Sequence, residues 1–184
     1  MMKKVKIILP VAIILIFILL SATPVLGSWD SIVENEVYIR EGEEFEGDLW
    51  VIGRSVEIKG RVKGDLLIFA EELKVSGQID GDLLGMVGRT EITGNLQGNL
   101  RLLSMVTRIN GLVAGNISAA GTELLIEPEA TVSTLWGWYN LANISGEIRE
   151  SAVVNGNIFN LTGKVGEDLK IGVNKGFIAE SALI

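Results

Sequence analysis

The feature that most constrains this chain is a short phrase that returns about every 17 residues. Each copy opens with glycine, then Asp or Asn, then Leu or Ile. The glycines of the clearest copies are Gly47, Gly64, Gly81, Gly98 and Gly115. The acidic or amide residues that follow them are Asp48, Asp65, Asp82, Asn99 and Asn116. A fixed period indicates stacked structural units, so the chain from residue 47 onward should be one repetitive architecture.

Within each copy, apolar residues alternate with polar residues or glycine, which indicates strands rather than helices. One aliphatic ladder consists of Ile58, Val75, Ile92, Ile109 and Ile126, and it resumes after one inserted residue as Ile144, Leu161 and Ile178. Another consists of Val62, Ile79, Leu96, Val113, Ala130, Ile148, Val165 and Ala182. Together these ladders indicate about eight copies between Gly47 and the C-terminus.

A second glycine ladder marks a second corner in each copy. It consists of Gly60, Gly77, Gly94 and Gly111, and Pro128 takes its fifth place. Glycine suits sharp turns and positive φ, and proline fits a corner but not a central strand. We therefore predict an all-β, single-stranded β-solenoid in which each copy is one turn of three short faces. Turns stacked about 4.8 Å apart would place like residue over like and build the core as columns.

The N-terminal segment has a different composition from the repeat. Lys3, Lys4 and Lys6 precede an apolar run, residues 7–20, and a small-residue stretch follows. This is the layout of a secretory signal peptide, and an uncleaved membrane anchor is the alternative. We predict that residues 1–27 are a signal peptide or anchor, 28–46 a cap or linker, and 47–184 the solenoid. Either alternative places the solenoid outside the cytoplasm, secreted or anchored at the cell envelope.

Repeated phrases such as "GDLWVIGRSVEIKGRVKGDLLIF" resemble the bactofilins, and in particular the secreted, signal-peptide-bearing branch of polymer-forming bactofilin-like proteins. The resemblance implies a right-handed triangular β-helix that polymerises end to end without nucleotide and acts as a scaffold at the cell envelope. The last three copies depart from the pattern. Thr134, Ser151 and Asp168 stand at the Asp/Asn position, and Glu150 and Glu167 replace the glycine in two of them.

Composition argues against most enzymatic and nucleic-acid functions. The net charge is -7 without a basic patch, so nucleic acid is not an expected partner. The chain has no cysteine and no histidine, which removes thiolate ligands and the commonest general base. The glycines follow the turn spacing and do not open a helix, so no nucleotide site is expected. We expect no catalytic residues and no cofactor.

The acidic column Asp48, Asp65 and Asp82 is a candidate metal site, because a Ca²⁺ ion would relieve repulsion between stacked carboxylates. The alternative is that Asp and Asn suit the turn that follows glycine.

Outward positions of the repeat form a predicted apolar face. It consists of Trp50, Ile52, Leu67, Phe69, Leu84, Met86, Leu103, Trp136 and Trp138. An exposed apolar strip of this length indicates an interaction surface. Three interpretations are open: lateral self-association, contact with a membrane surface, and covering by the segment 28–46 with Trp29, Ile32 and Val33.

The ends of a solenoid present unpaired backbone groups and an open core. The predicted self-assembly ends consist of Val37, Ile39, Phe45, Ile178, Ala182 and Leu183. From this we expect a non-enzymatic, polymer-forming scaffold of the cell envelope whose partner is itself, with membrane contact through the N-terminal segment if it stays uncleaved. The alternative is a monomeric extracytoplasmic binding module that presents its Trp/Phe face to a glycan or a protein.

Overall fold

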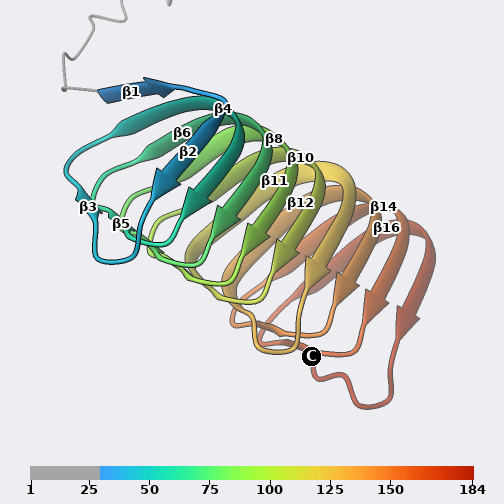
Figure 1. Cartoon of the computed structure of the whole chain (residues 1–184). Helices are drawn as coiled ribbons and strands as arrows, with labels where there is room; N and C mark the ends of the chain where they lie inside the picture. Colours follow the sequence, from blue (N-terminus) through green and yellow to red (C-terminus); the bar gives the residue numbers. More distant parts are fainter. Residues whose placement is uncertain (1–29) are drawn as a thin grey trace, which may run out of the picture.

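The computed structural model describes residues 30–184, and these residues form a rod of stacked parallel strands (Figure 1). All sixteen strands belong to one sheet that winds through about nine turns. The predicted signal or anchor segment and Trp29 lie outside the described residues. In the part of the chain that is described, no helix is long and apolar enough to cross a bilayer.

From β4 to β15, each turn consists of a long strand and a short strand. The long strands are β4 (Leu49–Ile58), β6 (Leu66–Val75), β8 (Leu83–Ile92), β10 (Leu100–Ile109), β11 (Leu112–Ile126), β12 (Thr131–Ile144), β14 (Ala152–Leu161) and β16 (Leu169–Ile178). The short strands are β3 (Glu44–Phe45), β5 (Arg61–Val62), β7 (Gln78–Ile79), β9 (Asn95–Leu96), β13 (Glu147–Ile148) and β15 (Lys164–Val165). In β11 and β12 the short strand is continuous with the long one that follows.

The register of the sheet confirms the β-solenoid predicted from the repeat. Leu49 pairs with Leu66, Leu66 with Leu83, and Leu83 with Leu100. In β4 the buried positions are Leu49 and Val51, and then Val56 and Ile58. The alternation slips by one residue between these pairs, so the long strand turns a corner there. One long strand therefore supplies two faces of each turn, and the short strand supplies the third.

The structure contains one more turn than the eight copies counted in the sequence. Strands β1 (Asp30–Val33) and β2 (Glu36–Ile39) pair in parallel with β4, and β3 pairs with β5. The segment 30–45 is therefore the first turn of the solenoid and does not fold over the outward face. Covering of that face by this segment is not what the structure shows, because its backbone is used in the parallel ladder.

Two positions in the second aliphatic ladder were assigned incorrectly from the sequence. Val113 pairs with Val132 rather than with Ala130, and the parallel bridge between Lys164 and Leu183 places Ala182 level with Gly163 and not with Val165. The reason is a wider corner that is closed by a β-turn hydrogen bond. Ala130 N–H donates to the Glu127 carbonyl at 2.9 Å, and Ala182 N–H donates to the Ala179 carbonyl at 3.0 Å. Each of these two β-turns adds residues that a corner built on glycine does not need.

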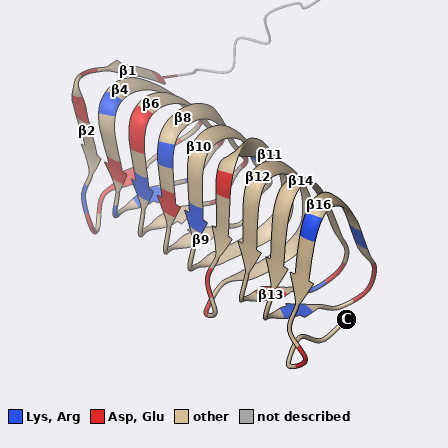
Figure 2. Ribbon diagram, turned by 90° about the vertical axis from the view of Figure 1, so that its right-hand side faces the viewer, with Lys and Arg blue, Asp and Glu red and all other residues tan. Residues whose placement is uncertain are grey.

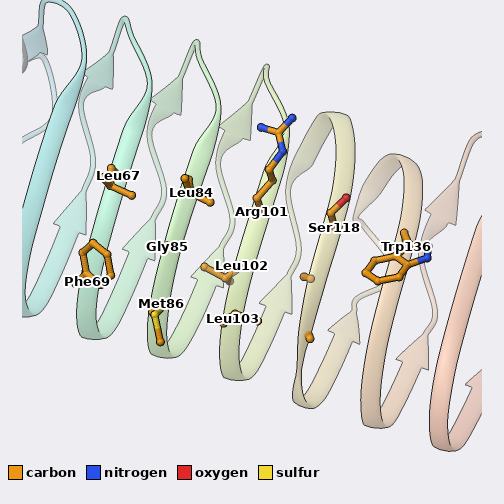
Figure 3. A pocket seen from close by; sticks show the side chains of 12 residues that line it. Leu67, Phe69, Leu84, Gly85, Met86, Arg101, Leu102, Leu103, Ser118 and Trp136 are labelled. Carbon is orange, nitrogen blue, oxygen red and sulfur yellow. The ribbon is translucent and has the colours of Figure 1, made fainter. Parts of the chain in front are cut away.

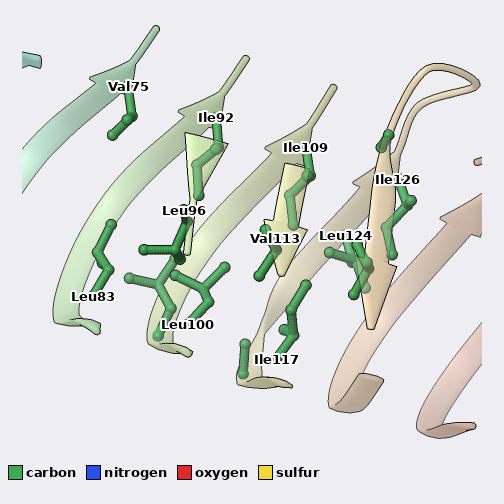
Figure 4. Close-up of a cluster of buried hydrophobic side chains, with 14 of the residues drawn as sticks. Val75, Leu83, Ile92, Leu96, Leu100, Ile109, Val113, Ile117, Leu124 and Ile126 are labelled. Atoms are coloured by element: carbon green, nitrogen blue, oxygen red, sulfur yellow. The ribbon is translucent and has the colours of Figure 1, made fainter. Parts of the chain in front are cut away.

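Columns of aliphatic side chains form the core (Figure 4). The glycines at the corners let these columns stack closely. A Cβ built on Gly77, Gly94 or Gly111 would overlap the backbone carbonyl of the turn before it. Positive φ occurs only at Gly42, Gly47 and Gly156 among the described glycines. Most of the ladder glycines are therefore required by the close approach of two backbones and not by a left-handed conformation.

Tyr139 is the largest fully buried side chain of the core. It stands in one column between Gly121 and Gly156, and its ring lies against Gly121 and Gly137. Its hydroxyl and the hydroxyl of Thr107 are both buried, and neither has a hydrogen-bond partner of good geometry among the described residues. Burial raises the pKa of Tyr139 to about 12, and the Thr107 hydroxyl opposes that rise only in part.

Replacing Tyr139 by Phe tests this description. The variant should be about 1–3 kcal/mol more stable near pH 8, because an unpartnered buried hydroxyl is removed. In the wild type the folded pKa of about 12 exceeds the ordinary value of 10.0, so stability is complete below pH 10.0 and falls as the pH rises toward 12. The slope should be about 1.4 kcal/mol per pH unit.

Denaturant unfolding of both proteins between neutral and strongly alkaline pH measures the two effects. Tyr38 is the only other tyrosine and stays in both proteins as an internal control. Equal alkaline losses in the wild type and in Tyr139→Phe would contradict the assignment.

Candidate functional site

The Asp/Asn column is a hydrogen-bonded ladder along one corner of the solenoid. The Asp48 carboxylate accepts the backbone N–H of Asp65 at 2.8 Å, and Asp65 accepts that of Asp82 at 2.8 Å. Asp82 accepts the N–H of Asn99 at 2.7 Å, and Asn99 accepts that of Asn116 at 3.0 Å. Each side chain thus binds the same position one turn further on, which explains why Asp and Asn both serve.

This ladder favours the structural interpretation of the column over a metal site. The Asn99 N–H, followed by Arg101 and the Asn99 side chain, lowers the pKa of the Asp82 carboxyl. Between residues 30 and 184, no three His, Cys, Asp or Glu side chains gather closely enough to hold a metal ion. In the later copies Glu150 accepts hydrogen bonds from Ser133 and Thr134 instead. The carboxylates of this corner therefore join successive turns.

Asp82→Ala should destabilise the solenoid by about 1–2 kcal/mol, because the Asn99 N–H loses its acceptor. Asp82→Asn should cost less than about 1 kcal/mol, since Asn99 already performs the same task and the exposed Arg101 pair contributes little. Because the folded state lowers the pKa of Asp82, its stabilisation is present at neutral pH and is lost as the pH falls through that pKa. Denaturant midpoints of the three proteins provide the measurement, and equal losses in both variants would contradict the ladder.

The predicted apolar face lies on the first half of the long strands, in two outward columns. One column runs Trp50, Leu67, Leu84, Arg101, Ser118 and Trp136, and the other Ile52, Phe69, Met86, Leu103, Ala120 and Trp138. All nine predicted members therefore stand on one side of the rod. Leu67 is half-buried, and the other eight are exposed. We call these nine residues the apolar face.

Two exposed residues beside the apolar face were not anticipated from the sequence. Val33 is 69% exposed and pairs with Ile52, so it extends the second column by one turn. Met105 is 66% exposed and stands at the corner where the alternation slips. Neither position follows from the 17-residue pattern, because the first turn is offset and the corner breaks the alternation.

A hollow interrupts the apolar face where its large side chains give way to Ser118 and Ala120 (Figure 3). Its volume is about 380 Å³, and its walls include Phe69, Met86 and Trp136. Arg101 is the one charged residue in the lining, and its guanidinium is paired with Asp82. The hollow therefore offers apolar contact and almost no free polar chemistry.

The second half of the long strands forms a face of the opposite character. Glu57, Lys74, Glu91 and Arg108 stack in one outward column, so the sign of the charge alternates from turn to turn. Bands of alternating acidic and basic residues are visible across these strands in Figure 2. Stacked opposite charges attract, so the charges of this face compensate one another between turns and the face stays hydrated.

The two ends of the rod differ. At the first turn Val37 and Ile39 are buried, and Phe45 is half-buried. At the last turn Ile178 is 45% exposed and Leu183 is 63% exposed, and Ala182 is half-buried against the core. Strand β16 pairs only with β14, so its outer edge carries unpaired backbone groups. Strands β1 and β2 likewise pair only with β4, so the two ends differ in the exposure of their core columns and not in the presence of an unpaired edge.

In comparisons with known proteins, no family model, no curated protein and no solved structure matches this chain.

Proposed function

We propose that this protein is a non-enzymatic scaffold that assembles with copies of itself through the ends of its solenoid. The observation that carries the proposal is the open C-terminal turn. Ile171 continues the column of buried Val154, and Ile178 continues that of buried Leu161, yet both are exposed. An unfinished core and an unpaired strand edge at the same place favour association with another strand.

The first turn of a second copy offers a fitting continuation. Ile39 begins the inward column that ends at Ile178, and every intermediate member of this column is aliphatic. Stacking Ile39 of one copy on Ile178 of another would extend the column and the parallel ladder together. Head-to-tail stacking of this kind repeats without a limit and produces filaments.

The buried polar side chains and the carboxylates at the corners support a structural role. The buried polar side chains of the described residues are Thr90, Ser104 and Thr107, and the carboxylates of the corner join successive turns. The basic and apolar N-terminal sequence supports a place outside the cytoplasm, at the cell envelope. The resemblance to the bactofilins supports polymer formation, and it is independent of the exposure at the C-terminal end.

A second candidate function is a monomeric extracytoplasmic binding module. The exposed Trp and Phe side chains of the apolar face favour it, since aromatic residues dominate recognition surfaces. The two candidates differ in what purified protein does alone. Filaments support the scaffold, whereas a uniform monomer that binds an isolated cell-wall glycan or protein supports the module.

Residues 28–184 should form filaments in negative-stain electron microscopy, and Leu183→Lys should abolish them. The lysine places a charge in the apolar contact between ends, where it cannot stay hydrated. Met105→Lys is the matched control, because Met105 is equally exposed but lies on the side of the rod. The control should still form filaments. A monodisperse wild type, or filaments that persist in Leu183→Lys, would contradict assembly through this end.

A further inference from the structure

The apolar face extends along most of the rod and has no partner among the described residues. Together with Val33 on β1, which extends its second column, the face reaches Trp138 on β12 after six steps between strands, roughly 29 Å. Its members include three tryptophans, Phe69 and Met86. Tryptophan is the residue that prefers the boundary between lipid and water.

The charge distribution separates this face from the rest of the protein. Over the full height of the rod its two columns contain Ser31, Trp50, Leu67, Leu84, Arg101, Ser118, Trp136, Val153 and Lys170, and Val33, Ile52, Phe69, Met86, Leu103, Ala120, Trp138, Asn155 and Gly172. No carboxylate occurs in either column, although the chain has a net charge of -7. The only charges are those of Arg101 and Lys170. Each of these cations already faces a carboxylate, Arg101 that of Asp82 and Lys170 that of Asp168, so an approaching surface would meet apolar groups and ion pairs whose charges offset each other.

The size of the face argues against a second copy as its occupant. Two columns of side chains about 15 Å wide and roughly 29 Å long cover about 450 Å². Each partner in a stable interface usually buries about 800 Å². The hollow at Ser118 and Ala120 further reduces the fit to a rigid flat partner, whereas fluid acyl chains fill such a hollow.

A glycan is also a poor occupant. Ligand sites combine apolar walls with placed polar groups. In the lining of the hollow the polar side chains are those of Arg101 and Ser118, and Arg101 is already held by Asp82.

The connection to the N-terminal segment points in the same direction. The apolar run ends at Leu20 and β1 begins at Asp30, so residues 21–29 form the connection. Fully extended, these residues reach at most about 32 Å. Val33 stands in the apolar face only a few residues after this connection. A bilayer that holds the run would therefore lie within reach of the face.

We propose that the apolar face is a lipid-contacting surface, with the rod lying along the outer side of a bilayer. Trp136 and Trp138 would enter the interfacial region, and acyl chains would occupy the hollow over Ala120. This proposal does not rest on the end contact, and it is tested in the Leu183→Lys background as well as in the wild type.

The test uses the full chain reconstituted in vesicles of equal parts phosphatidylcholine and phosphatidylglycerol, with bromine on the acyl chains near the carbonyl end. Trp29→Phe and Trp50→Phe leave Trp136 and Trp138 as the only tryptophans. Their fluorescence should be quenched by the brominated lipid. The control replaces all four tryptophans by Phe and adds Arg108→Trp, which reports from the charged face and should keep its emission.

Two further variants sharpen the result. Leu84→Lys combined with Met86→Lys removes two exposed apolar side chains, so the partition of the face into lipid should fall by at least about tenfold. The quenching of Trp136 and Trp138 should decrease accordingly. Ala120→Leu fills the hollow and adds apolar surface, so quenching should be kept or increased. If Ala120→Leu lost its lipid contact, the lipid would bind in the hollow as a specific pocket and not along the whole apolar face.

Two outcomes would overturn the proposal. One is equal emission from Trp136 and Trp138 and from the Arg108→Trp reporter in brominated vesicles. The other is a lipid-independent dimer in sedimentation that Leu84→Lys breaks, which would assign the face to a second copy. Both outcomes can also be measured on protein that forms no filaments, because the quenching experiment does not require assembly.

Discussion

The structure depends on one constraint: each residue stacks in parallel on the equivalent residue one turn away. Leu49, Leu66, Leu83 and Leu100 are the plainest case, since each pairs with the next in register. A separation of about 4.8 Å makes every property of one turn a property of a column. Aliphatic columns become the core, Asp and Asn become a hydrogen-bonded ladder, and alternating charges become a stable hydrated face. The apolar face follows from the same rule.

The corners determine whether this stacking is possible. At Gly64 an added Cβ would overlap Gly47 and the Asp48 carboxylate, so glycine and aspartate are required together. The glycine allows the backbones to approach, and the aspartate uses that approach to bind the next N–H at 2.8 Å. The recurring Gly-Asp phrase therefore combines two functions, and only at Gly47 does its glycine also adopt a positive φ.

The sequence predicted the solenoid and the sides on which its residues lie, because glycine spacing and alternation both act through local geometry. It did not predict the first turn, whose Asp30 pairs with Leu49 at an offset that the 17-residue pattern does not contain. The positions of Ala130 and Ala182 were missed because β-turn hydrogen bonds at those corners add residues. Met105 and Tyr139 were missed for a related reason, since their surroundings depend on a corner and on glycines from neighbouring turns.

The periodicity that makes the rod stable also leaves it without a natural end. Any turn that matches the one before it exposes the same core columns, as Ile171 and Ile178 do at the C-terminal end. If ends stack, the apolar faces of successive copies line up along one side, because the register that joins turns also joins copies. A face of about 450 Å² on each copy, too small for tight binding alone, then acts many times on one surface. End contact and lipid contact would therefore strengthen each other.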